Sequence, residues 1–341
     1  MKQGLHLDVT TFCSMKIFVV GGAGYIGSHV CKELLRAGHS VMVYDNLSTG
    51  LQQNLQPDAG FVRGDIHEPL RLREEISSFG AEAVVHLAAS KAAGESMIDP
   101  SKYSLNNISG SIQLINAAVE CGVKSFLLSS TAAVYGAPQY LPIDEKHPTE
   151  PENYYGFTKL EIERVLAWYD QLKGLTFGAL RYFNAAGYDP EGTITGLERN
   201  PANLLPVVME TAMGMRPSMQ VFGNDYPTPD GSGVRDYIHV SDLARAHKLA
   251  LEWMDAEKKS LTVNLGTGRG ISVLEMIRAT EEMVGHPFAW EIAERRPGDP
   301  AELYASSALA KELLGWEAEL SDIDTLLRTT WNAYRANLPK E

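Results

Sequence analysis

Short apolar runs alternate with amphipathic segments through the first half of the chain. The apolar runs, rich in β-branched residues and each of strand length, are residues 17–20, 41–44, 83–87, 126–129 and 177–182. The segments between them with apolar positions at helical spacing are residues 28–37, 105–121 and 155–172. Strands that alternate with helices are typical of βαβ units, in which helices cover both faces of a parallel sheet. The pattern therefore predicts an α/β protein with a doubly wound parallel sheet.

The second half of the chain is less regular. Gly and Pro are scattered through residues 189–233, and we expect a helix at 242–253, a strand at 261–265 and a helix at 272–284. This arrangement predicts a second, smaller α/β lobe. We divide the chain into an N-terminal extension at 1–14 that lies outside the fold, a first domain at 15–184 and a second lobe at 185–341. Part of 236–266 is expected to return to the first domain.

Charge and cysteine content exclude several classes of partner. The 341 residues carry a net charge of -13, which gives no general electrostatic reason to bind nucleic acid or an anionic membrane. The apolar run at 17–20 is far below the roughly 20 residues of a membrane span, and residues 1–14 lack the apolar core of a signal peptide. Three distant cysteines, Cys13, Cys31 and Cys121, allow neither a disulfide framework nor a zinc pattern. We expect a cytoplasmic protein without a metal site.

A glycine-rich segment follows the first predicted strand directly and opens the first helix. Its sequence, Gly-Gly-Ala-Gly-Tyr-Ile-Gly at 21–27, places Gly21, Gly24 and Gly27 where the backbone can approach a pyrophosphate at a helix N-terminus. Asp45 ends the second predicted strand, where its carboxylate can accept hydrogen bonds from both hydroxyls of a ribose. Because that carboxylate would repel a 2′-phosphate, it favours NAD over NADP. The glycines alone could form a turn that binds nothing. Their position between a strand and a helix, together with Asp45 at the end of the next strand, instead predicts a Rossmann NAD-binding domain.

Tyr155 and Lys159 lie four residues apart on one predicted helix, so their side chains share a face. A free tyrosine has a pKa of about 10, and lowering it to near 7 requires roughly 4 kcal/mol of preferential stabilisation of the phenolate. Lys159 and a cationic nicotinamide ring can supply that field. The segment Ser129-Ser130-Thr131 closes a predicted strand, and a hydroxyl there, such as that of Thr131, could relay or position the substrate proton. The spacing alone is common on amphipathic helices, but with the glycine motif, Asp45 and Thr131 it predicts a catalytic group.

These motifs resemble the extended short-chain dehydrogenase/reductase family, and within it the UDP-glucose 4-epimerases (UDP-galactose 4-epimerases). Matching segments span nearly the whole chain from Met15: 21–29, 44–47, 64–66, 91–96, 129–136, 155–159, 181–184, 222–228 and 234–240. The stretch from Phe222 to Val240 is more specific than the glycine motif. Two positions differ conservatively, because Val20 stands where the family often has Thr and Thr131 where it often has Ser.

The resemblance implies a set of binding residues in both parts of the chain. The NAD site would be lined by Tyr155 and Lys159 together with Tyr25, Ile26, Asp45, Asn46, Asp65, Ile66, Leu87, Lys91, Asn106 and Phe183. The second lobe would be the substrate-binding lobe. The UDP-sugar would be held there by Asn184, Asn203, Leu204, Phe222, Arg235, Arg296 and Asp299, with Thr131 close to the sugar. Arg235 and Arg296 carry planar guanidinium groups suited to a diphosphate, although two surface ion pairs would also account for them.

The resemblance also implies an isomerase that interconverts UDP-glucose and UDP-galactose. In that reaction Tyr155 takes the proton of the sugar O4, NAD oxidises C4, the 4-keto sugar rotates, and hydride returns to the opposite face. A dehydratase would need an acid–base pair after Thr131, where this chain has Ala132 and Ala133. A non-catalytic NAD sensor would have no need of Tyr155, Lys159 and Thr131 together. Family members commonly form homodimers, and we expect one here.

Leu303 stands at the position where these epimerases carry a gatekeeper of substrate size. That residue is large in enzymes confined to UDP-glucose and UDP-galactose, and smaller in those that also accept N-acetyl sugars. Leu is intermediate in size. The alternative of an epimerase acting on UDP-N-acetylglucosamine therefore stays open.

Overall fold

The computed structural model describes residues 14–198, 201, 203–296 and 299–338, and within these ranges seven parallel strands form one sheet. In spatial order they are β11 (Leu261–Leu265), β6 (Thr176–Tyr182), β5 (Ser125–Ser129), β4 (Ala83–His86), β1 (Lys16–Val20), β2 (Ser40–Asp45) and β3 (Gly60–Arg63). The expected doubly wound parallel sheet is confirmed. The extension predicted at 1–14 lies, apart from Ser14, outside the described residues.

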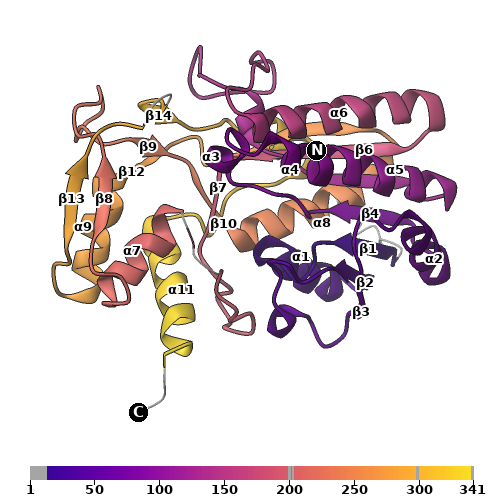
Figure 1. Ribbon diagram of the computed structural model, residues 1–341, viewed down its shortest axis with the longest axis horizontal. Helices are drawn as coiled ribbons and strands as arrows, with labels where there is room; N and C mark the ends of the chain where they lie inside the picture. Colours follow the sequence, from indigo (N-terminus) through magenta and orange to yellow (C-terminus); the bar gives the residue numbers. More distant parts are fainter. Residues whose placement is uncertain (1–13, 199–200, 202, 297–298, 339–341) are drawn as a thin grey trace, which may run out of the picture.

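Both faces of the sheet are covered by helices. On β1, Ile17 and Val19 are buried in one hydrophobic core, whereas Phe18 and Val20 are buried in the core on the opposite face. The first core includes apolar side chains of α1 (Tyr25–Arg36) and α8 (Val240–Glu257), and the second those of α2 (Pro69–Phe79), α5 (Gly110–Glu120) and α6 (Tyr154–Lys173). Figure 1 shows the two groups of helices on opposite sides of the strands. A strand buried on both faces reads as the continuous apolar run seen in the sequence.

The strand order reverses direction at β1. The chain runs outward from β1 through β2 to β3, and then from β4 outward through β5 and β6 on the other side. The loops that leave the carboxyl ends of β1 and β4 therefore diverge, and ligands of doubly wound sheets bind in the crevice between such loops. The glycine-rich segment at 21–27 leaves β1 at this point.

Several elements of the first domain were not anticipated, among them β3 (Gly60–Arg63) and α2 (Pro69–Phe79), and one expected helix is irregular. β3 is an edge strand with half-buried residues, and α2 buries only Leu72 and Ile76, so neither has a strong apolar signal. Between β4 and α5 the chain forms α3 (Ala93–Ser96), α4 (Pro100–Tyr103) and a π-helical segment, η2 (Ser104–Ser109). The helix expected at 105–121 therefore begins as a π-helix, a distortion frequent at functional sites.

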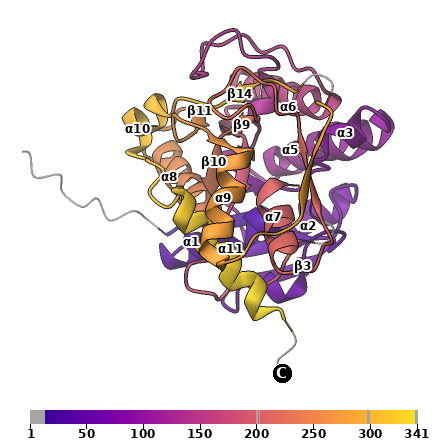
Figure 2. The same ribbon diagram turned by 90° about the vertical axis from the view of Figure 1, so that its left-hand side faces the viewer.

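The second lobe packs three helices around a pair of parallel strands. The helices are α7 (Leu204–Ala212), α9 (Val273–Val284) and α11 (Ile323–Ala336), and the strands are β8 (Met219–Phe222) and β13 (Trp290–Ala293). Their shared core contains Val208, Val221, Ile277 and Leu326. This lobe lies at the left of Figure 1, and Figure 2 views the molecule from that side, with α9 and α11 in front.

Short strands join the two parts of the chain. β7 (Asn184–Ala186) pairs with β10 (Tyr237–His239), and β9 (Val234–Arg235) lies between β12 (Ile271–Ser272) and β14 (Glu302–Leu303). After β10 the chain returns to the large sheet, where α8 packs against α1 and β11 becomes the edge strand beside β6, near α10 (Ala308–Leu314). Across the residues that the structure describes, no helix combines the length and the apolar character needed to cross a bilayer.

Candidate active site

The glycine-rich segment forms a tight turn into α1. Gly21 has a φ of +87°, which glycine adopts without strain, and a Cβ atom at Gly27 would lie 2.1 Å from the carbonyl oxygen of Gly21. Gly24 is the N-cap of α1, and glycine offers no side chain to satisfy the first N–H groups of the helix. The first turn also holds no acidic residue. This bare helix start suits an anionic pyrophosphate.

Asp45 is held against this turn at the end of β2. Its Oδ2 accepts a hydrogen bond from the N–H of Ala23 (3.0 Å), and its Oδ1 accepts one from the N–H of Leu47 (2.8 Å). A carboxylate has about four acceptor positions, so two remain for a ligand. The buried, oriented carboxylate beside a glycine turn offers acceptors for the two hydroxyls of an NAD ribose, and these residues fit the expected cofactor.

The predicted residues Asn46, Asp65 and Ile66 lie together beyond the ends of β2 and β3. The Nδ2 of Asn46 donates to Asp65 Oδ2 over 2.8 Å, and His67 Nδ1 lies 2.6 Å from Asp65 Oδ1. Partial burial raises the pKa of Asp65, but the hydrogen bonds from Asn46 and His67 outweigh burial and hold that pKa below its usual value. Ile66 is buried next to Gly110 of α5. His67 was not anticipated from the sequence.

Leu87, Lys91 and Asn106 stand on the segments that follow β4. Leu87 donates its N–H to the carbonyl of Val20 (2.9 Å), and Asn106 Nδ2 donates to Ser90 Oγ (3.3 Å). Lys91 reaches out of the first domain and forms an ion pair with Glu198. The loop after β4 is thereby tied to the segment that precedes α7.

Tyr155, Lys159 and Thr131 converge where β5 ends and α6 begins. The N-cap Asn153 starts α6 by accepting from the N–H of Gly156 over 2.9 Å, and the N–H of Tyr155 donates to Ser96 Oγ over 3.0 Å. Burial raises the pKa of the Tyr155 phenol, while a hydrogen bond from the Thr131 hydroxyl lowers it. Burial also lowers the pKa of Lys159 to about 8, because the charged ammonium loses solvation. A proton-transferring pair with perturbed pKa values is typical of an active site.

The residues assigned to the UDP-sugar lie on the second lobe and its connecting strands. Asn184 Nδ2 donates to the carbonyl of Asp236 (3.0 Å), while Asn203 and Leu204 stand at the start of α7. Two further pairs involve only residues named by the resemblance. Arg235 forms an ion pair with Asp299, and the guanidinium carbon of Arg296 lies 3.9 Å from the ring centroid of Phe222.

Leu303 connects the two sets of residues. On β14 it is in register with Arg235 of β9, and its side chain packs in a small cluster with Phe183, Ala132 and Val134. Ala132 and Val134 belong to the turn that follows Thr131. The expected gatekeeper position therefore lies near the turn that follows Thr131.

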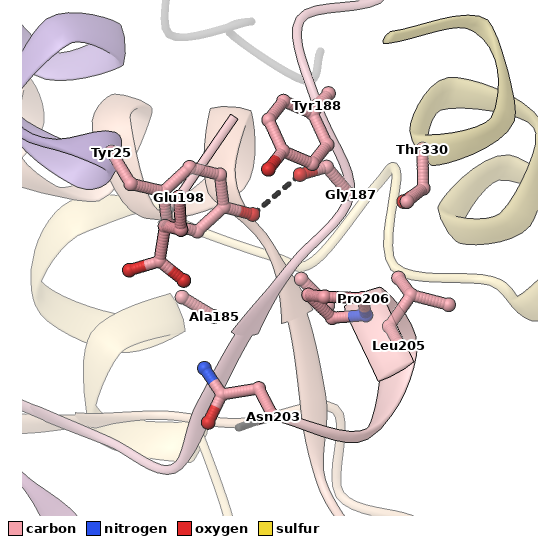
Figure 3. A pocket seen from close by; sticks show the side chains of 10 residues that line it. Tyr25, Ala185, Gly187, Tyr188, Glu198, Asn203, Leu205, Pro206 and Thr330 are labelled. Carbon is pink, nitrogen blue, oxygen red and sulfur yellow. Dashed lines mark hydrogen bonds between the residues drawn. The ribbon is translucent and has the colours of Figure 1, made fainter. Parts of the chain in front are cut away.

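Tyr25 joins the glycine turn to the second lobe. Figure 3 shows its hydroxyl pointing to the carbonyl of Gly187, to which it donates a hydrogen bond. Glu198, Asn203 and Tyr188 line the same small pocket. Because Tyr25 is buried, the pKa of its phenol is raised, so it stays a hydrogen-bond donor in this contact.

Several polar contacts around the reactive pair were not predicted from the sequence, although Ser129 belongs to the predicted strand end that offers a hydroxyl. Ser129 accepts from the Lys159 ammonium through its backbone carbonyl (2.9 Å), and its hydroxyl lies 2.5 Å from the Tyr182 hydroxyl and 3.2 Å from His247 Nε2. Glu163 lies four residues beyond Lys159 on α6, on the same helix face as Tyr155 and Lys159. The four-residue spacing in the sequence could therefore have indicated it. The other contacts join distant segments and leave no local signal.

Comparison with known proteins gives matches over nearly the whole length of the chain. Residues 17–266 match the sequence profile of the NAD dependent epimerase/dehydratase family. The UDP-glucose 4-epimerase of Lacticaseibacillus casei is 46% identical over 319 residues, which cover 93% of this chain and 96% of the relative.

Solved structures of similar sequence also have the same fold. The crystal structure of UDP-glucose 4-epimerase from Brucella ovis in complex with NAD aligns with a TM-score of 0.92 and 44% identity, covering 94% of this chain and 98% of that one. The UDP-glucose-4-epimerase from Stenotrophomonas maltophila, with bound NAD and formylated UDP-arabinopyranose, aligns with a TM-score of 0.91 and 42% identity at the same coverages. The likeness therefore includes both lobes.

Proposed function

Because the chain belongs to the NAD dependent epimerase/dehydratase family, we propose that it is an isomerase that interconverts UDP-glucose and UDP-galactose. The observation that carries this proposal is the convergence of Tyr155, Lys159 and Thr131 at the end of β5. The glycine turn and Asp45 supply an NAD site in the same domain. The curated relatives of similar length that carry the name UDP-glucose 4-epimerase support the choice of substrate.

In the proposed mechanism the phenol of Tyr155 exchanges a proton with the sugar O4. The Thr131 hydroxyl lowers the pKa of the phenol and so favours its ionised form. Lys159 adds positive charge from one turn further along α6, fixed in place by the carbonyl of Ser129. The NAD that the glycine turn and Asp45 would hold would supply reversible hydride transfer at the sugar C4. Since burial by itself raises the pKa of Tyr155, the ionised phenol depends on these neighbouring groups.

The second lobe is proposed to hold the nucleotide part of the substrate while the sugar turns. Arg235 carries five N–H donors, of which one faces Asp299 and another the carbonyl of Val234, so others remain for a diphosphate. The guanidinium of Arg296 lies over the Phe222 ring, a contact that favours a cation–π interaction. With the diphosphate anchored, the hexose stays free to turn, so that either face of its C4 can be presented to the nicotinamide ring.

Two other functions are less well supported. A dehydratase needs an acid and a base beside the substrate after Thr131, whereas Ala132 and Ala133 stand there, in a turn next to α6. A non-catalytic NAD sensor would need neither the buried ammonium of Lys159 nor its contact with Ser129. Epimerisation of UDP-N-acetylglucosamine stays open as a second activity, because Leu303 is smaller than an aromatic gatekeeper.

The chain is further proposed to act as a homodimer in the cytoplasm. A group of apolar side chains is exposed on α6 and on the neighbouring segments of α3 to η2, namely Met97, Ile98, Leu105, Phe157, Trp168 and Leu172. Exposed apolar patches of this kind mark protein interfaces. Trp168→Glu should convert the dimer to a monomer in sedimentation experiments, and a parent protein that sediments as a monomer would contradict the proposal.

The decisive experiment incubates the purified protein with UDP-galactose and UDP-glucose separately and analyses the products. We expect each sugar nucleotide to yield the same mixture of both. A protein that retains NAD, converts neither sugar and copurifies with a protein partner would support the sensor instead. A 4-keto-6-deoxy product would support the dehydratase.

A further inference from the structure

One face of α6 is fastened to the end of β5 at three successive turns of the helix. The face carries Tyr155, Lys159 and Glu163, spaced four residues apart, so their side chains lie one above the other. Their partners are three consecutive residues of the β5 end. The Thr131 hydroxyl lowers the pKa of the Tyr155 phenol, Lys159 donates to the Ser129 carbonyl over 2.9 Å, and Glu163 accepts from the Ser130 hydroxyl.

The third of these contacts belongs to a buried hydrogen-bond network. The Glu163 carboxylate is buried and accepts from Nε of Arg181 at 3.1 Å and 3.2 Å, in addition to the Nη2 contact. Arg181 also donates to the Tyr135 hydroxyl over 2.9 Å, and Tyr135 donates to Asn264 Oδ1 over 2.7 Å. The network thus joins α6, β5, β6 and β11 in the protein interior.

A buried ion pair of this kind is not explained by stability alone. Removing two charges from water costs several kcal/mol per ion, and an apolar pair of similar size often stabilises a fold equally well. Directional contacts do, however, select a single arrangement of the packed elements. Ser130 lies between Ser129 and Thr131, so its hydroxyl holds the strand segment from which both neighbours reach Lys159 and Tyr155.

We propose, resting on the function proposed above, that the Ser130–Glu163 hydrogen bond positions the catalytic groups by setting the register of α6 against the end of β5. Ser130 and Glu163 are positioning residues that act through Thr131 and Lys159. Without the bond, the strand end can shift relative to the helix. The Thr131 hydroxyl then moves away from Tyr155, and the Ser129 carbonyl moves away from the ammonium group of Lys159. Misplacement of reacting groups by about 1 Å can cost as much as 10²-fold in rate.

The test removes the Ser130 hydroxyl and leaves the ion pair intact. Substituting Glu163 would strand the guanidinium of Arg181 without a counter-charge and could prevent folding. Ser130→Ala removes one oxygen, Ser130→Thr keeps the hydroxyl, and Ser125→Ala is a matched control at the other end of β5. Each variant is purified as the full chain with its retained NAD and assayed with UDP-galactose.

For Ser130→Ala we expect kcat to fall about tenfold, with KM for UDP-galactose within about twofold of the parent, because substrate contacts are unchanged. Ser130→Thr should recover most of kcat, and Ser125→Ala should match the parent. A parental kcat for Ser130→Ala, or an equal loss in Ser125→Ala, would overturn the positioning role. So would a tenfold loss in Ser130→Thr, because its hydroxyl is retained.

A second measurement does not depend on activity. Hydrogen exchange followed by mass spectrometry should show faster exchange at 129–133, about tenfold, in Ser130→Ala but not in Ser125→Ala. If the parent converts neither sugar, the proposed function fails, and the exchange result still decides whether the hydroxyl fixes this segment. Unchanged exchange in Ser130→Ala would refute the inference even in an active enzyme.

Discussion

The ammonium group of Lys159 donates a hydrogen bond to the backbone carbonyl of Ser129 over 2.9 Å, and both residues are buried. The contact fixes the ammonium group on the same face of α6 as Tyr155, one helical turn away. Burial lowers the pKa of Lys159 to about 8, so its ammonium group loses a proton more readily than an exposed lysine does. Glu163, one turn away, partly offsets the effect of burial.

The pH dependence of turnover follows from this lowered pKa. Lys159 carries its charge below about pH 8 and loses it as the pH rises through that value. Because the charge favours the ionised phenol of Tyr155, we expect kcat to decline on the alkaline side near pH 8. The profile of kcat for UDP-galactose measures this. A kcat that stays constant to about pH 10, near the usual lysine pKa, would contradict the assignment.

Tyr155→Phe should abolish most turnover without unfolding the protein. The change removes only the phenolic oxygen from a packed ring, so we expect retained NAD and a kcat lower by about 10²- to 10⁴-fold. Tyr154→Phe is the matched control, because the Tyr154 hydroxyl bonds to Ser104 and lies on a different side of α6. Near-parental activity in Tyr155→Phe would exclude this residue as the proton acceptor.

Hydrogen at C4 of the sugar should stay with the substrate during the reaction. The diphosphate anchors keep the oxidised sugar in the site while it turns, so the hydrogen removed from C4 returns to the same molecule. A UDP-galactose deuterated at C4 should yield UDP-glucose with full retention of the label, measured by mass spectrometry. Loss of deuterium to water would exclude the mechanism.

Arg235→Ala and Arg296→Ala should weaken UDP-sugar binding and spare NAD retention. Each loses charge-assisted hydrogen bonds worth about 1.5–3 kcal/mol, so KM should rise at least about tenfold. Arg295→Ala is a suitable control, because that guanidinium bonds to Asp225 Oδ1 (2.7 Å) and lies over Tyr226. Comparable loss of NAD in the Arg235 or Arg296 variant would count against their assignment to the diphosphate.

Leu303 should set the breadth of substrate choice. Its side chain packs beside Phe183 and the turn after Thr131, where an aromatic ring would narrow the site. We expect the parent to turn over UDP-N-acetylglucosamine as a secondary substrate, and Leu303→Tyr to suppress that activity while sparing UDP-glucose. Assays of both sugars on both proteins decide the matter. A parent that converts UDP-galactose but no N-acetyl sugar would show that Leu303 already closes the site.

The local pattern of the sequence was sufficient for much of the fold and for the core of the site. β1 and the other central strands are buried on both faces, so each appears as a continuous apolar run. Tyr155 and Lys159 are separated by one helical turn, and the glycine turn lies within a single strand–helix junction. Features that depend on neighbours within one element, or on adjacent elements, leave a periodic signal that can be read directly.

Long-range contacts required the tertiary structure. Edge strand β3 and helix α2 bury too little apolar surface to stand out from the surrounding chain. The Lys91–Glu198 and Arg235–Asp299 ion pairs and the Ser130–Glu163 bond join residues far apart in sequence. Such pairs form only when helices and strands pack against one another, because packing brings the two side chains together. The hydrophobic periodicity within a single element therefore carries no information about them.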